Sequence, residues 1–124
     1  MQEQWKDDQP IYRQLRDRMI GLIMEGAYNE GEAIPSVRAV SAEFQINHLT
    51  VSKAYQELVD EGLVEKRRGL GMFVIEGARE KILNTEREKF LAIELPQLLQ
   101  RILQLGISKD ELIQKIQSAQ EDKS

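Results

Sequence analysis

The sequence contains no cysteine among its 124 residues. This absence excludes a disulfide framework, a thiol nucleophile and a thiolate metal site. The single histidine, His48, has neither a second histidine nor an acidic cluster at metal-ligand spacing beside it, so we expect no metal site. No phosphate-binding loop or dinucleotide fingerprint is present, because Gly69-Leu70-Gly71 is too short and follows an expected strand. We therefore expect a protein that is not an enzyme and needs no cofactor.

Long apolar runs and a secretion signal are also missing. No stretch is long enough to cross a bilayer. The first eight residues are polar and acidic, without the basic stretch and apolar core of a signal peptide. We expect a cytoplasmic chain with no membrane partner, and its 41% hydrophobic and 31% charged residues are typical of a globular fold.

The chain also lacks an excess of positive charge, since its net charge is −4 and its pI is about 5.1. Residues 1–76 carry 9 basic and 13 acidic groups, and residues 77–124 carry 8 of each. Any attraction to nucleic acid must therefore come from the local placement of cations. The densest basic cluster is Lys66-Arg67-Arg68.

Apolar spacing predicts three helices in the first half of the chain. From Ile11, apolar residues recur at spacings of three and four until Gly26. A second, short helix follows Ser36, whose hydroxyl can cap it. Asn47 can cap a third helix, whose apolar residues share one stripe: Val51, Ala54, Tyr55, Leu58 and Val59. A polar arm over residues 1–10 precedes these helices, and we expect Trp5 to dock on the domain.

The pattern changes to two short strands after the third helix. One starts at Val64 and the other covers residues 72–74, with a glycine-rich turn over residues 67–71 between them. Three helices followed by a hairpin predict a mainly α fold with a small β-hairpin wing, a winged helix-turn-helix. We assign residues 1–76 to a DNA-binding domain and residues 77–124 to a helical dimerisation region.

The second region is helical and rich in leucine. Pro96 predicts a kink or break, Gly106 ends the segment, and Ser108 with Glu111 forms a capping box for a last helix. Its apolar face is too wide for 48 residues to bury alone, so we expect a homodimer. The alternative is that the face folds back on its own N-terminal domain, and both can hold. The dimerisation candidates are Leu91, Leu95, Leu98, Leu99, Ile102, Leu103, Leu112 and Ile116.

The third helix has the features of a recognition helix, which is apolar on its buried side and unobstructed on the other. Its exposed N-terminal end presents backbone N–H groups suited to phosphate. An ordinary solvated helix face is the alternative. The outward side chains are those of Asn47, His48, Leu49, Thr50, Ser52, Lys53 and Gln56.

Two basic features support a DNA-binding interpretation. At the hairpin tip, Gly69 and Gly71 let the backbone near Arg67 and Arg68 approach a groove, although a solubilising turn is the alternative. Arg38, on the second helix, can contact guanine through two hydrogen bonds or clamp a phosphate. The alternative for Arg38 is a surface ion pair with Glu43 or Glu57.

Four blocks of sequence in this order resemble the GntR family of regulators, over roughly residues 11–75. The short helical C-terminal part is similar to the YtrA-like subfamily, whose tail dimerises in place of a large effector domain. The blocks are Gly31-Glu32-Ala33-Ile34-Pro35-Ser36-Val37-Arg38, Thr50-Val51-Ser52-Lys53-Ala54-Tyr55-Gln56-Glu57-Leu58, Glu61-Gly62-Leu63, and Gly69-x-Gly71-x-Phe73-Val74.

The resemblance implies roles for individual residues. It places Ser36 and Arg38 on the DNA backbone and a base. It assigns the major-groove surface to Asn47, His48, Thr50, Ser52 and Lys53, and the minor-groove contact to Arg67, Arg68, Gly69 and Gly71. His48 stands where the family commonly has Arg or Pro, and Leu49 where Asn is frequent. Leu49 is expected to touch a thymine methyl group or to cover the helix end.

The expected function is sequence-specific regulation of transcription. The resemblance implies a repressor of a nearby transporter operon, binding palindromic double-stranded operator DNA as a homodimer. Two helices cannot enclose a pocket of several hundred Å³, so we expect any small-molecule effector to bind between subunits or between the tail and the winged domain. The alternative function is a winged-helix module for protein interaction or assembly, which the acidic pI supports.

Overall fold

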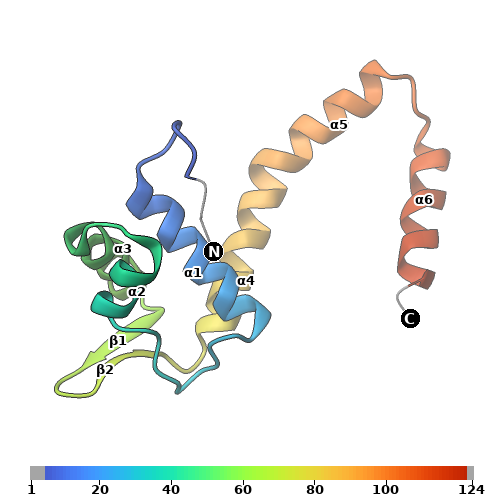
Figure 1. Cartoon of the computed structure of the whole chain (residues 1–124). Coiled ribbons are helices and arrows are strands. Elements are labelled where there is room, and N and C mark those ends of the chain that lie inside the picture. The colour runs from blue at the N-terminus through green and yellow to red at the C-terminus, as the bar shows by residue number, and fades with distance from the viewer. Residues whose placement is uncertain (1–4, 123–124) are drawn as a thin grey trace. The chain divides into compact units, whose positions relative to one another are not determined.

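A computed structural model describes residues 5–122 (Figure 1). Residues 1–4 of the predicted arm and the last two residues lie outside this range. The chain divides into two compact units, Met1–Asn84 and Thr85–Ser124, which we describe separately. The elements in chain order are α1 (Ile11–Glu25), α2 (Val37–Phe44), α3 (His48–Asp60), β1 (Val64–Arg67), β2 (Gly71–Val74), α4 (Ala78–Lys89), the π-helical turn η1 (Phe90–Glu94), α5 (Leu95–Gln104) and α6 (Lys109–Asp122).

The core of the first unit lies where α1 and α2 pack against α3. The predicted apolar stripe of α3 is confirmed, because Val51, Ala54, Tyr55 and Leu58 are all buried, with Val59 partly buried beside them. Full burial of each large aliphatic side chain contributes roughly 1.5–3 kcal/mol. The buried residues that meet this stripe from the other two helices are Leu15, Met19, Ile23 and Val40.

The polar arm docks on the helices, as predicted for Trp5. The Trp5 ring contacts the Phe44 ring edge-on, with the ring centroids 6.3 Å apart and the ring planes at 75°. Gln14 of α1 fixes the arm further, since its Nε2 donates to the carbonyls of Lys6 and Gln9 at 2.7 and 2.8 Å. The backbone N–H of Lys6 donates in return to Gln14 Oε1 at 2.8 Å.

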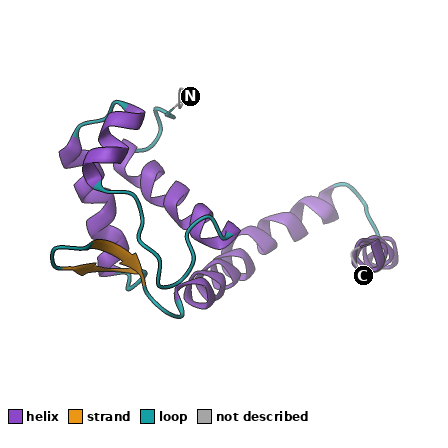
Figure 2. Ribbon diagram, turned by 60° about the horizontal axis from the view of Figure 1, so that its bottom comes forward, coloured by secondary structure: helices purple, strands orange, loops and turns teal. Residues whose placement is uncertain are grey.

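The wing is an antiparallel hairpin (Figure 2) whose register runs from Val64 opposite Val74 to Arg67 opposite Gly71. The turn predicted over residues 67–71 is therefore shorter, because Arg67 and Gly71 belong to the strands. The segment just before α2 pairs with the outer edge of β2, which we did not predict. Gly31 N–H donates to the Val74 carbonyl at 2.9 Å, and Ile34 N–H donates to the Met72 carbonyl at 2.9 Å.

The first unit extends eight residues beyond residue 76, where the sequence analysis ended the DNA-binding domain. Ala78 and Ile82, in the first half of α4, are buried in its core, at 1% and 4% exposure. The assignment of function to the two regions stays a prediction. No helix in the described range is both long enough and apolar enough to cross a membrane.

The chain stays helical through Pro96, so of the two predicted alternatives, a kink or a break, the break does not occur. Pro96 has no N–H to donate, and its ring would clash with the carbonyl four residues earlier in a regular α-helix. The chain instead widens into the π turn η1, where Leu95 N–H donates to the Phe90 carbonyl five residues back. Pro96 then lies in the first turn of α5, where a proline is tolerated.

The large apolar side chains of the second unit are mostly exposed, those of α6 included. Leu112 is half-buried, while Ile113 and Ile116 are 49% and 50% exposed. One half of the predicted capping box is present, since Glu111 N–H donates to Ser108 Oγ at 3.1 Å. On the rest of the tail, the exposed large apolar residues are Phe90, Leu91, Ile93, Leu98, Leu99, Leu103 and Leu105.

Candidate nucleic-acid interface

The N-terminal ends of α2 and α3 are fixed by the two predicted caps. Ser36 Oγ accepts a hydrogen bond from Ala39 N–H at 3.0 Å, and Asn47 Oδ1 accepts one from Leu49 N–H at 2.8 Å. Each cap uses only the acceptor of its side chain. The hydroxyl proton of Ser36 and the amide NH₂ of Asn47 therefore remain to donate outward.

Side chains from these two helix starts share one surface. Arg38 and His48 line a hollow of about 550 Å³, together with Val37, Ser41 and Ala42. Arg38 is exposed and forms no ion pair with any residue in the described range, so the pairing with Glu43 or Glu57 does not occur. Its guanidinium is thus available for a base or a phosphate.

The remaining outward residues of α3 differ in how freely they extend. His48, Leu49 and Ser52 are exposed, with Leu49 at 67%, whereas Thr50 is half-buried. Lys53 is also exposed, but its Nζ lies 4.1 Å from the centroid of the Tyr12 ring, over the start of α1. This cation–π contact, worth about 0.5–1 kcal/mol at an exposed site, holds the positive charge beside α1.

The wing carries its three cations in two different states. Arg67 lies along the hairpin, with its Cζ 4.2 Å from the Phe73 ring centroid and its Nε donating to Glu65 at 3.1 Å. Lys66 and Arg68 are exposed and form no ion pair within residues 5–122. Lys66 and Arg68 are therefore the cations of the wing whose charge faces solvent without a carboxylate partner in the described range.

The turn of the wing depends on glycine for its backbone. Gly69 and Gly71 have φ of 77° and 111°, a region that favours glycine. Leu70 N–H donates to the Arg67 carbonyl at 2.9 Å and closes the turn. The Leu70 side chain is 71% exposed. This apolar side chain at the wing tip was not predicted from the sequence, although the position of Leu70 between two glycines indicates it.

Tyr55 joins α3 to the start of α2. Its hydroxyl donates to the Pro35 carbonyl at 2.6 Å, one residue before the Ser36 cap, and the residue is 1% exposed. Burial raises the pKa of the Tyr55 hydroxyl, so the group stays protonated as a donor. The buried stripe predicted its ring, but nothing in the spacing indicated its hydrogen-bond partner.

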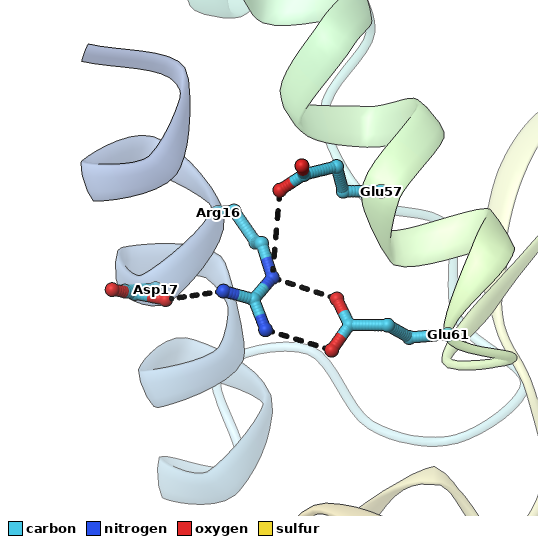
Figure 3. A network of polar contacts seen from close by, with 4 residues as sticks. All are labelled: Arg16, Asp17, Glu57 and Glu61. Atoms are coloured by element: carbon cyan, nitrogen blue, oxygen red, sulfur yellow. Dashed lines mark hydrogen bonds and ion pairs between the residues drawn. The ribbon is translucent and has the colours of Figure 1, made fainter. Parts of the chain in front are cut away.

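Arg16 of α1 gathers acidic side chains from α1 and α3 (Figure 3). Its Nε and Nη2 donate to the Glu61 carboxylate at 2.6 and 2.7 Å, and Nη1 donates to Asp17 at 2.9 Å. Glu57 lies 3.8 Å from Nε. The hydrogen bonds to Glu61 raise the pKa of the Arg16 guanidinium, which keeps its charge.

The carboxylates of this network lie away from the N-terminal end of α3. Glu57 follows His48 by nine residues in α3, which corresponds to about 13 Å along a helix. Charges in water are screened over about 8 Å at physiological ionic strength. The Glu57 carboxylate is therefore largely screened from the N-terminal end of α3.

The comparisons with known proteins agree with this geometry. Residues 11–74 match the sequence profile of the bacterial regulatory proteins of the gntR family. The chain belongs to the GntR family. The match confirms the resemblance carried by the four sequence blocks, and the regulatory role of the family agrees with the expectation of a protein that is not an enzyme.

Similar proteins also extend over the tail of this GntR-family regulator. The HTH-type transcriptional repressor YtrA of Bacillus subtilis is 32% identical over 113 residues, which cover 91% of this chain and 86% of that protein. A crystal structure of a GntR-family regulator from Bacteroides thetaiotaomicron is 31% identical with a TM-score of 0.76, covering 93% of this chain and all of that chain. These similarities confirm the winged helix followed by a helical C-terminal region.

One similar structure includes DNA. The DNA-binding domain of AraR in complex with the operator ORX1 is 27% identical, with a TM-score of 0.52, and covers 60% of this chain and 90% of that chain. The site residues of the GntR-family regulator fall into three groups by position: the paired helix starts, Lys53 beside Tyr12, and the wing. Within the described range no group of three or more side chains is placed to hold a metal ion.

Proposed function

We propose that this GntR-family regulator is a repressor that binds a palindromic operator as a homodimer. The observation that carries the proposal is the surface formed by the starts of α2 and α3. There, Arg38 is free of any carboxylate in the described range, and two caps leave donors facing outward. Arginine and amide donors in such a position can read base edges in the major groove.

We assign the major-groove side chains to α3 and the backbone contact to the cap of α2. Asn47, His48, Leu49, Thr50 and Ser52 would face bases, and Lys53 would neutralise a phosphate near the start of α1. Ser36 and Arg38 would contact the backbone and a base.

The wing would add a contact in the minor groove. Arg68 and Lys66 supply charges without carboxylate partners, while Arg67 stiffens the hairpin against Phe73. Gly69 and Gly71 let the backbone come close to the DNA.

The tail would supply the homodimer interface. On α5, Leu98, Leu99 and Leu103 are 49%, 44% and 77% exposed, and Leu95 and Ile102 are half-buried on the same helix. A continuous apolar face of this kind stabilises a protein only when a second surface covers it. Two copies joined there would place two recognition helices on the half-sites of a palindrome. A small-molecule effector bound between subunits remains a prediction.

A gel-shift titration with the DNA upstream of the chain's own gene tests the proposal, run at several salt concentrations with competitor DNA. Arg68→Ala should weaken binding to every sequence and reduce the salt slope by about 1 per half-site, or about 2 for the dimer. Arg38→Ala should cost about 1–3 kcal/mol per half-site and relax preference at one base position. Arg87→Ala removes the same charge from α4. This variant should leave the DNA affinity, the salt slope and the base preference unchanged.

Sequence-selective binding that follows this pattern would support an operator-binding regulator. Unchanged DNA affinity in both the Arg38 and Arg68 variants would contradict the site assignments. Absence of selective binding by the wild-type chain would favour the protein-interaction module instead.

A further inference from the structure

The tip of the wing presents one apolar side chain on an otherwise bare backbone. Leu70 is 71% exposed, although full burial of a leucine is worth roughly 1.5–3 kcal/mol. A Cβ built on either neighbour, Gly69 or Gly71, would meet no other atom of the protein within 4 Å. These glycines are thus required by their positive φ and by no packing within the chain, so the space around Leu70 is open.

The charges around this leucine indicate the kind of surface that it can meet. Lys66 and Arg68 flank the turn and have no carboxylate partner in the described range, and Arg67 is held along the hairpin by Phe73 and Glu65. An apolar protein partner would have to bury these cations, which is costly. A DNA minor groove suits both features, because phosphates line its edges and the stacked base pairs at its floor can admit an apolar side chain.

We propose that Leu70 enters the minor groove beneath the wing and wedges into one base-pair step. The operator preference then depends on how easily that step unstacks. Pyrimidine–purine steps such as TA deform most readily, whereas unstacking a stiffer step costs more. This role rests on the proposed operator binding and adds to it a specificity determinant that forms no hydrogen bond to a base.

The test starts from the full-length wild-type chain, which selects duplexes from a random-sequence library. In the best duplex, each base step flanking the major-groove half-site is then replaced in turn by TA and by GG. For one step under the wing, wild type should bind the TA duplex about tenfold more tightly than the GG duplex, within the range of single-position effects. Leu70→Ala should reduce this ratio to within about twofold, and Leu70→Met should keep it, because methionine retains an apolar side chain of similar size.

Two controls separate a wedge from a general effect of removing a leucine. Leu49→Ala should change the preference in the half-site and leave the step preference under the wing intact. Leu83→Ala, which removes an exposed leucine of α4 outside the candidate DNA and dimer surfaces, should leave both preferences intact. The salt slope of the Leu70→Ala variant should equal that of wild type, because no charge is removed.

The outcomes also separate this inference from the proposed function. Selective operator binding by wild type together with an unchanged step preference in Leu70→Ala overturns the wedge and leaves the proposed function standing. An equal loss on every duplex, accompanied by a change in oligomeric state, assigns Leu70 to a contact between copies and likewise overturns the wedge. Absence of any selective binding by wild type overturns both.

Discussion

Tyr55 gives α3 two contacts of different kinds. Its ring fills the core between the helices, and its hydroxyl donates to the Pro35 carbonyl beside the cap of α2. The first contact holds α3 in the domain. The second fixes the spacing between the α3 surface and the residues that start α2.

Removing only the hydroxyl should separate these contacts. Tyr55→Phe should lower the free energy of unfolding by about 1 kcal/mol at neutral pH, the typical net value of one hydrogen bond. Urea titration of the full chain measures this quantity. Tyr28→Phe is the matched control at neutral pH, because the Tyr28 hydroxyl donates no hydrogen bond to a residue in the described range. An equal loss in both variants would contradict a specific role for the Pro35 contact.

The same variant also gives a pH dependence. Burial raises the folded-state pKa of Tyr55 above its ordinary value of about 10. A raised pKa stabilises the fold fully below the unfolded pKa, and this contribution decreases as pH rises above it. The stability difference between wild type and Tyr55→Phe should therefore narrow between pH 9 and pH 11. A difference that stays constant over this range, measured by thermal unfolding, would contradict the assignment.

At the scale of secondary-structure elements, sequence patterns predicted the features that depend on contacts between residues close in the chain. The stripe of α3 and the caps Ser36 and Asn47 follow from spacing and side-chain chemistry within a few residues, and the structure confirms them. The wing was predicted for the same reason, although its turn is shorter than expected. Arg67 and Gly71 pair across the strands, which a turn signal alone cannot indicate.

The features that sequence reasoning missed depend on contacts between distant residues. The strand-like pairing of residues 31–34 with β2 has no alternating pattern of its own. Lys53 was correctly placed on the outer side of α3, but its contact with Tyr12 depends on the packing of α1. The core extends to Ile82 for the same reason, since α4 returns to the first unit after the wing.

The π turn before Pro96 allows a prediction about the tail. Pro96→Ala restores the backbone donor and removes the ring, so a regular α-helix can continue through residues 90–100. We expect the free energy of local unfolding there to rise by about 1–3 kcal/mol. Amide hydrogen exchange at a fixed protein concentration measures this change.

Gln97→Ala, one residue further along α5, is the matched control for helix propensity, which differs by only a few tenths of a kcal/mol. If both variants slow exchange equally, the proline is not the cause of the π turn.

At the scale of the whole molecule, the chain separates its charges by location. Asp17, Glu57 and Glu61 collect around Arg16. Lys66 and Arg68 of the wing and Arg38 of α2 remain without carboxylate partners in the described range. A protein with a pI of about 5.1 can therefore still present a local positive surface. The net charge of the chain is therefore a poor indicator of DNA binding, because it does not show where the charges lie.

The proposed dimer gives a prediction at this scale. Replacing Leu99 and Ile102 together by Glu places two charges on the apolar face of α5, and the full chain should become monomeric in analytical ultracentrifugation. Its operator affinity should fall at least tenfold, because one winged domain makes too few contacts for tight binding. Gln97→Glu and Gln100→Glu together add the same charge elsewhere on α5 and should leave the dimer intact. A double Leu99 and Ile102 variant that stays dimeric would place the interface elsewhere.

The π turn at Phe90–Glu94 also has a consequence for how the length of the tail can change in evolution. A π turn is the local form taken by a helix that holds one residue more than its regular repeat. The wider turn absorbs the extra residue. Loss of a single codon between residues 90 and 94 would therefore restore a regular α-helix and leave the leucines of α5 on the same face relative to the helix that precedes them. The winged unit would keep every residue of its core and of its candidate DNA surface. The tail can thus lose one residue in this turn without moving its apolar face, whereas loss of a residue inside α5 would turn the leucines on either side of it by about 100° relative to each other.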